Sequence, residues 1–226
     1  MVKPLFRPFI LLLICAVLPL MGEKQVGKLD WDSLEIELTA LYGSRAGLRL
    51  RAWQKVLDEQ HVTTDQDKLT RVNRFFNQLN FVDDISLWGH KDYWATPLEF
   101  LGANGGDCED FSIAKYFSLL SLGIDESKMR ITYVKALSLN QYHMVLAYYP
   151  TPQSVPLILD NINGKILTAD KRKDLLPIYS FNGESLWLSK AKGQGKLAGK
   201  SSRLSSWNKL RERFNNSALR KPLFIP

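Results

Sequence analysis

Apolar residues recur at helical spacing through the first third of the chain. Leu34, Leu38 and Leu41 stand four and three residues apart, which predicts a helix that ends before Gly43. The same periodicity continues in two further segments, from 44 to about 59 and from 64 to about 79. We therefore expect three consecutive helices in this region.

The second and third helices have more specific signals. In the second, Leu48, Ala52, Val56 and Leu57 fall on one face, which predicts that this face is buried. The third is expected to begin at Thr64, because two aspartates follow it at once and acids in a first turn favour the helix dipole.

Two further predicted helices flank Gly105-Gly106. Thr96 as N-cap, Pro97 at the first position and Glu99 at the third are typical of a helix start. Gly105-Gly106 then interrupts the pattern, and helical periodicity returns over residues 107–122. The second of these helices thus begins directly after a flexible backbone.

Beyond Gly123 the period changes from helical to alternating, which indicates strands. Residues 130–136 and 143–149 predict one hairpin, and residues flanking Asn182-Gly183 predict another. The expected strands are 130–136, 143–149, 155–160, 178–181 and 185–188. Helices followed by antiparallel strands predict an α+β fold, with N-terminal helices packed on an antiparallel sheet.

The last 37 residues are predicted to be a linker and a helix. Residues 190–200 have little hydrophobicity and several glycines, which is typical of a flexible linker. Leu204, Trp207, Leu210 and Phe214 lie on one face of a short amphipathic helix. We expect residues 201–226, helix and tail, to dock on the domain 23–189; a free partner-binding helix is the alternative.

The first 22 residues differ from the rest. Lys3 and Arg7 precede an uncharged apolar run from Phe9 to Leu20, which is typical of a secretory signal peptide with cleavage after Gly22. The run is too short to span a bilayer comfortably, since that takes roughly 20 residues. An uncleaved membrane anchor and a buried helix remain the alternatives to export.

Composition narrows the function classes. Hydrophobic residues make up 45% of the chain and charged residues 23%, which excludes a wholly disordered protein. The net charge of +7 comes largely from residues 189–226, which hold ten Lys or Arg and one acid. Such a tail could contact anionic lipid or nucleic acid, but a solvated tail is favoured and no nucleic-acid motif is found.

Cysteine usage points to chemistry. Once residues 1–22 are removed, Cys108 is the remaining cysteine, so an exported domain would have no internal disulfide. It stands in the run Gly105-Gly106-Asp107-Cys108-Glu109-Asp110, in the first turn of a predicted helix. Exposed N–H groups at that position lower the pKa of a thiol and can also stabilise an oxyanion. Cys108 is therefore the candidate nucleophile.

A base and an orienting acid follow in the sequence. His143 opens the second strand of the first hairpin, and Asp160 ends the next strand. If these strands pair antiparallel, Asp160 can hold His143 in the useful tautomer, as in papain-type and transglutaminase-type triads. The alternative is an inert buried cysteine, a strand histidine bonded to backbone and a turn aspartate.

The segments YWATPLEFL at 93–101, GGDCEDFSIAKY at 105–116, His143 and Leu159-Asp160-Asn161 resemble the bacterial transglutaminase-like cysteine proteinases of the LapG type. The resemblance covers roughly residues 30–215. It implies a papain-like, transglutaminase-like fold in the periplasm and a triad of Cys108, His143 and Asp160. It also implies cleavage beside a di-alanine site in the N-terminal region of a large biofilm adhesin, calcium dependence, and inhibition by an inner-membrane receptor for cyclic di-GMP.

The acids around Cys108 are candidate calcium ligands. Asp107, Glu109 and Asp110 surround the thiol, and three acids would raise its pKa unless a cation offsets them. Alternatively, Asp107 is an N-cap and the other two acids only occupy the first turn. The resemblance favours calcium at Asp107 and Glu109 and leaves Asp110 unassigned. Trp94 is a candidate oxyanion donor or groove wall, with core packing as its alternative.

Two other functions are compatible with the sequence. The same triad could pass an acyl group to an amine, as in a transglutaminase or amidase. The chain could also be a calcium-dependent binding module whose thiol is inert. The sequence favours the cysteine endopeptidase over both.

Overall fold

The computed structural model describes residues 30–58, 64–189 and 195–226. The chain divides into Met1–Asp30 and Trp31–Pro226, and the helices and strands belong to the second unit. The predicted signal peptide, residues 1–22, lies outside the described residues. Among those that are described, no helix combines the length and apolarity that a membrane crossing requires.

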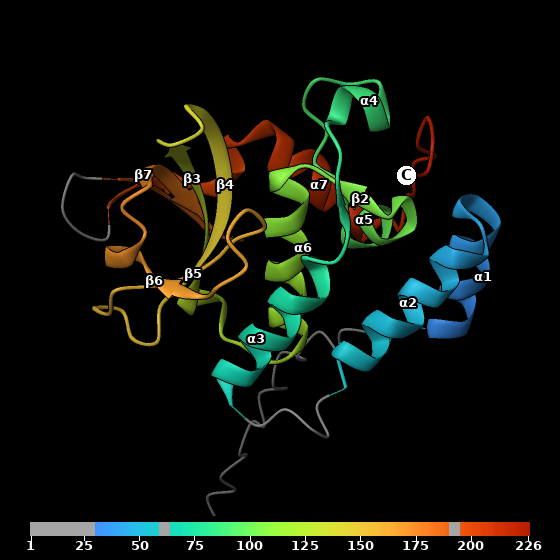
Figure 1. Cartoon of the computed structure of the whole chain (residues 1–226), viewed down its shortest axis with the longest axis horizontal. Helices are drawn as coiled ribbons and strands as arrows, with labels where there is room; N and C mark the ends of the chain where they lie inside the picture. Colours follow the sequence, from blue (N-terminus) through green and yellow to red (C-terminus); the bar gives the residue numbers. More distant parts are fainter. Residues whose placement is uncertain (1–29, 59–63, 190–194) are drawn as a thin grey trace, which may run out of the picture. The chain divides into compact units, whose positions relative to one another are not determined.

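Helix α6 lies between the other N-terminal helices and the sheet (Figure 1). It contacts α3 and α5 on one side and strands β3 and β4 on the other. The helices are α1 (Trp31–Tyr42), α2 (Ser44–Val56), α3 (Asp65–Phe76), α4 (Asp84–Trp88), α5 (Pro97–Ala103), α6 (Cys108–Ser121) and α7 (Ser205–Asn215). The predicted order of helices before strands is confirmed.

Two of the predicted helix starts have the expected caps. The Thr64 hydroxyl accepts from the Asp67 N–H at the start of α3. At α5, the Thr96 hydroxyl accepts from the Glu99 N–H, and the Glu99 carboxylate accepts from the Thr96 N–H at 2.7 Å. This reciprocal pair is a capping box.

The buried face of α2 differs from the prediction. Ala46, Leu50 and Trp53 are in the core, whereas Leu48 is 69% exposed and Ala52 is exposed as well. Val56 is the one predicted residue that is fully buried. The predicted face of this helix was therefore wrong by about one third of a turn.

Seven strands form one antiparallel sheet in the order β6-β5-β4-β3-β7-β8-β9. The strands are β3 (Met129–Ala136), β4 (Gln141–Tyr148), β5 (Leu157–Leu159), β6 (Leu167–Thr168), β7 (Leu175–Phe181), β8 (Ser185–Leu188) and β9 (Lys196–Lys200). A separate parallel pair joins β1 (Asn80–Phe81) to β2 (Gly105–Gly106). Both predicted hairpins and the α+β class are confirmed.

Part of the predicted linker is a strand. Lys196–Lys200 forms β9, which pairs with β8 from Leu188↔Lys196 to Ser185↔Lys200. An edge strand tolerates lysines and a glycine because one of its sides faces solvent. Low hydrophobicity therefore did not distinguish this edge strand from a linker.

The C-terminal helix packs into the core. Trp207 is 1% exposed and its ring lies 5.3 Å from that of Phe181, and Leu210 is fully buried. The tail beyond α7 also contacts the domain, since the Arg220 carbonyl accepts from the Tyr42 hydroxyl at 2.6 Å. Helix α7 thus belongs to the same core as α6.

We expect Trp207→Ala to lower the free energy of unfolding by about 3–5 kcal/mol, because it leaves a large cavity beside Phe181. Chemical denaturation monitored by circular dichroism would measure this. Lys209→Ala, an exposed change on the same helix, should stay within about 0.5 kcal/mol of the parent. Equal stability of the two variants would show that α7 is not part of the cooperative core.

Candidate active site

At the start of α6, the Asp110 side chain packs closely against the backbone of Gly106. A Cβ at this position would lie 2.1 Å from Asp110 Oδ2, so only glycine fits without a rearrangement. Asp110 Oδ2 accepts from the Asp107 N–H, and its Oδ1 accepts from the Ala95 N–H at 2.7 Å. These bonds place Cys108 as the first residue of the helix.

The thiol of Cys108 is half-buried against strand β4. Its Sγ donates to Glu109 Oε2 at 3.0 Å and accepts from the backbone N–H of Met144. The Ser112 hydroxyl lies 3.0 Å from the Cys108 carbonyl and 2.9 Å from the Met144 carbonyl. The nucleophile candidate therefore touches the residue that follows His143 in the chain.

His143 and Asp160 form a buried pair. His143 Nε2 lies 2.7 Å from Asp160 Oδ1, and the two residues are 3% and 1% exposed. A carboxylate at this distance favours the tautomer with the proton on Nε2, which leaves Nδ1 as a proton acceptor. The predicted pairing of these two residues is present in the structure.

The Asp160 carboxylate has two further donors. Oδ1 accepts from the Ile162 N–H at 2.9 Å, and Oδ2 accepts from Arg172 Nη2 at 2.7 Å. Burial alone would raise the pKa of Asp160, but the hydrogen bonds from His143, Ile162 and Arg172 bring it below its usual value. Asp160 is therefore a stable anion beside the imidazole.

The thiol is on α6 and His143 is on β4, two elements that pack together. Within the described residues no hydrogen bond joins Cys108 Sγ to the His143 ring, because the thiol is directed at Glu109. The other histidines are elsewhere: His90 contacts Arg220, and His61 lies outside the described residues. His143 is thus the described histidine on a strand that packs against α6.

The electrostatics around Cys108 oppose the expected low thiol pKa. Burial raises the pKa of Cys108, and the charges of Glu109 and Asp107 raise it further. The first-turn N–H groups do not outweigh these acids. A thiolate would need a nearby positive charge.

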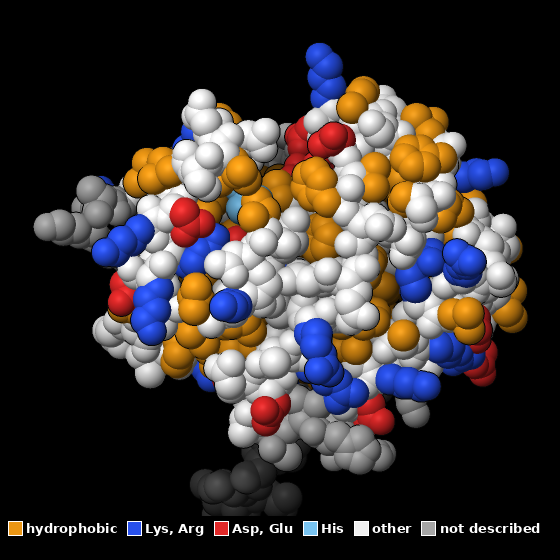
Figure 2. Space-filling model, in the orientation of Figure 1, with side chains coloured by type: hydrophobic (Ala, Val, Ile, Leu, Met, Phe, Trp, Pro, Cys, Tyr) orange, Lys and Arg blue, Asp and Glu red, His pale blue; other side chains and the backbone are white. Residues whose placement is uncertain are grey.

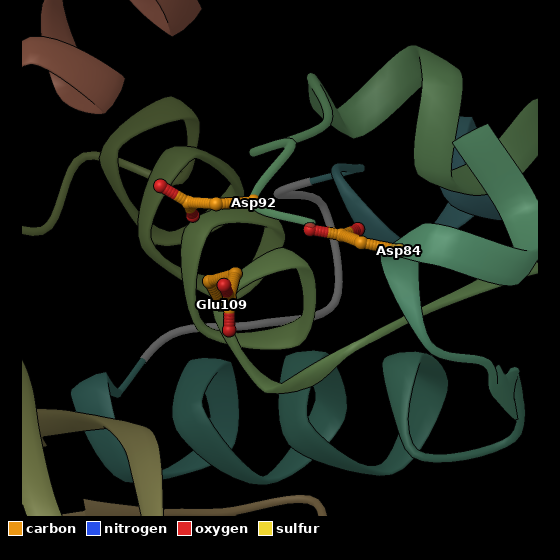
Figure 3. Close-up of side chains that lie close together, drawn as sticks. All are labelled: Asp84, Asp92 and Glu109. Carbon is orange, nitrogen blue, oxygen red and sulfur yellow. The ribbon is translucent and has the colours of Figure 1, made fainter. Parts of the chain in front are cut away.

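Two groups of three carboxylates, which share Asp84, lie at the start of α6. Figure 3 shows Asp84, Asp92 and Glu109, whose oxygens lie within 4.8 Å of one another. Asp84 also groups with Asp107 and Asp110 within the same limit. Sequence reasoning missed Asp84 and Asp92, because they stand 24 and 16 residues before Cys108, at the start of α4 and in the loop after it, and no spacing rule connects them to the thiol.

These residues fit a calcium ion. Asp84 Oδ1 and Asp107 Oδ1 are buried and lack a hydrogen-bond partner. Burial and the neighbouring acids raise the pKa of Asp84 to about 7 and that of Asp107 to about 12, so the cluster without a cation retains protons. Calcium prefers six to eight oxygen ligands and supplies the charge that the cluster lacks. The holders would be Asp84, Asp92, Asp107 and Glu109.

The remaining predicted site residues have other contacts. Both carboxylate oxygens of Asp110 already accept backbone N–H groups, so Asp110 acts first as a cap. The Trp94 indole N–H donates to Asp92 Oδ1 at 2.9 Å, and its ring stacks on Phe181 at 5.7 Å. We therefore do not assign Trp94 as an oxyanion donor. The Cys108 N–H, in the first helical turn, stays a candidate for that role.

Residues 51–188 match the bacterial transglutaminase-like cysteine proteinases, and the chain belongs to this family. It is therefore a cysteine proteinase with a transglutaminase-like fold, as the resemblance implied. A comparison with curated protein sequences gives no match.

Solved structures of Legionella pneumophila LapG are similar over most of both chains. The calcium-bound form is 42% identical with a TM-score of 0.70, and the match covers 82% of this chain and 99% of that chain. The EGTA-treated form is 42% identical with a TM-score of 0.71, and the match covers 82% and 97%. A relative with the same fold thus binds calcium.

Asp84→Asn tests the newly found ligand. The amide keeps an acceptor for the Tyr93 N–H but loses the charge, so we expect at least about tenfold weaker calcium binding by isothermal titration calorimetry. Asp83→Asn is the matched control, because Asp83 is exposed and lies outside the cluster. Unchanged affinity in Asp84→Asn would remove this residue from the site.

The raised pKa of Asp84 predicts a pH-dependent stability without calcium. Its ordinary pKa is 3.8 and its folded value is about 7, so ionisation opposes folding. In EGTA, the melting temperature should fall as pH rises from 5 to 8, and excess calcium should restore it most at pH 8. Asp84→Asn should lose the part of this dependence that lies below about pH 7, whereas Asp107, with a pKa of about 12, keeps its own part up to pH 8. A flat profile in EGTA for the parent protein would contradict the cluster electrostatics.

Proposed function

We propose that this protein is a calcium-dependent endopeptidase that hydrolyses a peptide bond through a thioester on Cys108. His143 would act as the base and Asp160 as the residue that orients it. The buried His143–Asp160 pair, with His143 on the strand β4 that packs against the helix bearing the thiol, is the observation that carries the proposal. The family relationship supports it, because members are cysteine proteinases.

In the proposed reaction, the Cys108 proton passes to Nδ1 of His143, and the thiolate attacks the peptide carbonyl. First-turn N–H groups of α6 would stabilise the oxyanion. The C–N bond then breaks, the leaving amine takes the proton from His143, and water hydrolyses the thioester with His143 as base. A bound calcium would supply positive charge that offsets Asp84, Asp107 and Glu109 during these steps.

The hydrogen bond from the Cys108 thiol to Glu109 would explain why the proposed activity needs calcium. An Oε2 that accepts from Sγ holds the thiol in its protonated form. A cation held by the Glu109 carboxylate competes for the same oxygen and reduces the repulsion that a thiolate would feel. The proposed calcium dependence follows from this competition.

An apolar surface next to His143 supports a protein substrate. Leu137, Leu139 and Tyr142 on the β3–β4 hairpin are at least half exposed. The Tyr142 ring stacks on Tyr133 at 5.3 Å, and Figure 2 shows acidic side chains close to hydrophobic ones on this side of the molecule. An exposed patch of aromatic and aliphatic side chains on the hairpin that carries the candidate base is suited to a protein substrate.

The substrate and its context are proposed from the family resemblance. We propose that the protein acts in the periplasm on the N-terminal region of a large surface adhesin, beside a di-alanine site. Release of the adhesin would promote biofilm dispersal. An inner-membrane receptor for cyclic di-GMP would hold the protease inactive.

We expect Cys108→Ala to lower cleavage of a purified adhesin N-terminal segment at least about 1,000-fold, while the melting temperature stays close to that of the parent. Gel electrophoresis in calcium buffer would measure this, with a segment whose two alanines are replaced by arginine as the substrate control. Transfer of an added primary amine to a glutamine peptide, without cleavage, would favour a transglutaminase. Retained cleavage by Cys108→Ala would exclude this nucleophile.

A further inference from the structure

The two oxygens of Asp160 have separate partners. Oδ1 faces His143 Nε2 and the Ile162 N–H, and Oδ2 faces Arg172 Nη2. Arg172 is 3% exposed, so this is a buried charge pair. Because the carboxylate is symmetric, the donor at Oδ2 decides which oxygen remains for the imidazole.

Arg172 is itself held in place by an acid. Its Nε and Nη2 donate to the two oxygens of Asp174 at 3.0 and 2.8 Å, which is a bidentate pair. Asp174 follows Arg172 by two residues, just before β7, while Asp160 follows β5. A planar guanidinium with several donors can connect two such carboxylates, whereas a lysine ammonium lacks this fork geometry.

Arg172 does not lie on the thiol side of the sheet. It lines a cavity of about 520 Å³ together with Val134, Val145 and Ile158, and neither Cys108 nor His143 lines that cavity. These valines and the isoleucine form a separate small core on the sheet, apart from the core that contains α6. Arg172 can therefore act on the reaction through Asp160 and not by touching a substrate at the thiol.

We propose that Arg172 is a positioning residue that fixes the orientation of Asp160, and through it the Nε2-protonated form of His143. This inference rests on the proposed role of the His143–Asp160 pair. Lys115 of α6 is the other buried cation whose charge interacts with Asp160, but Arg172 supplies the directional hydrogen bond. Loss of the guanidinium frees the carboxylate to rotate and leaves a buried anion with one donor fewer.

Arg172→Met tests the inference, because methionine keeps much of the length and removes the donors. We expect kcat on the adhesin segment to fall by about 10- to 100-fold, with KM changed less than about twofold. Lys173→Met is the matched control: it removes one charge from the neighbouring, exposed position and should retain full activity.

Proton NMR of protein labelled with ¹⁵N-histidine supplies a readout independent of cleavage. The chain has three histidines, so the hydrogen-bonded Nε2 proton of His143 can be assigned with His143→Gln. This downfield signal should be present in the parent and in Lys173→Met, and lost or broadened in Arg172→Met. Arg172→Ala should recover activity in about 20 mM guanidinium but not in ammonium, since the adjoining cavity admits the small cation.

The kcat values and the His143 signal together test whether Arg172 positions Asp160. Reduced kcat with loss of the His143 signal supports positioning. Normal kcat, or reduced kcat with the signal intact, overturns it. If Arg172→Met does not fold, Arg172→Lys takes its place, and full activity with an unchanged signal in that variant overturns the inference. A parent protein that shows the signal but cleaves no segment would instead contradict the proposed function.

Discussion

Burial of negative charge is the constraint on which this site depends. Asp84, Glu99, Asp110 and Asp160 are each at most 3% exposed, and Asp107 has one buried oxygen without a partner. An isolated ionised carboxylate costs several kcal/mol to bury, so each must gain donors, a counter-charge or a proton. The way in which each acid is compensated separates the structural residues from the functional ones.

Two of these acids are compensated by the protein itself. Glu99 accepts from the Thr96 N–H and the Tyr93 hydroxyl, and Asp160 accepts from His143, Ile162 and Arg172. Asp84, Asp107 and Asp110 are compensated less well: Asp84 accepts one backbone N–H and Asp110 two, but burial and the neighbouring acids raise the pKa of all three. The residues that are compensated less well are the ones placed next to the thiol. A cation bound there would therefore stabilise the fold and reduce the repulsion on a thiolate through the same charge.

Local patterns in the sequence were sufficient to predict the helix starts, the hairpins and the pairing of His143 with Asp160. Each of these features depends on residues within about 20 positions of one another. The face of α2 was not predictable from leucine spacing, since Leu48 is exposed while the small Ala46 packs inside. Strand β9 looked like a linker because an edge strand needs few apolar residues. Asp84 joins the acid cluster only when α4 folds against the start of α6, and burial and the charges of that cluster raise the pKa of the thiol despite the helix dipole.

The two halves of the site are supported from opposite sides of the sheet. On the helix side, the Ser112 hydroxyl lies within hydrogen-bond distance of both the Cys108 and Met144 carbonyls, so one side chain links α6 to β4. On the other side, Arg172 holds Asp160. Charge changes at the acid cluster therefore act mainly on the thiol, whereas changes at Arg172 act on the imidazole. Because the thiol and the imidazole are controlled by separate charges, binding of a cation can alter the nucleophile while the His143–Asp160 pair keeps its geometry.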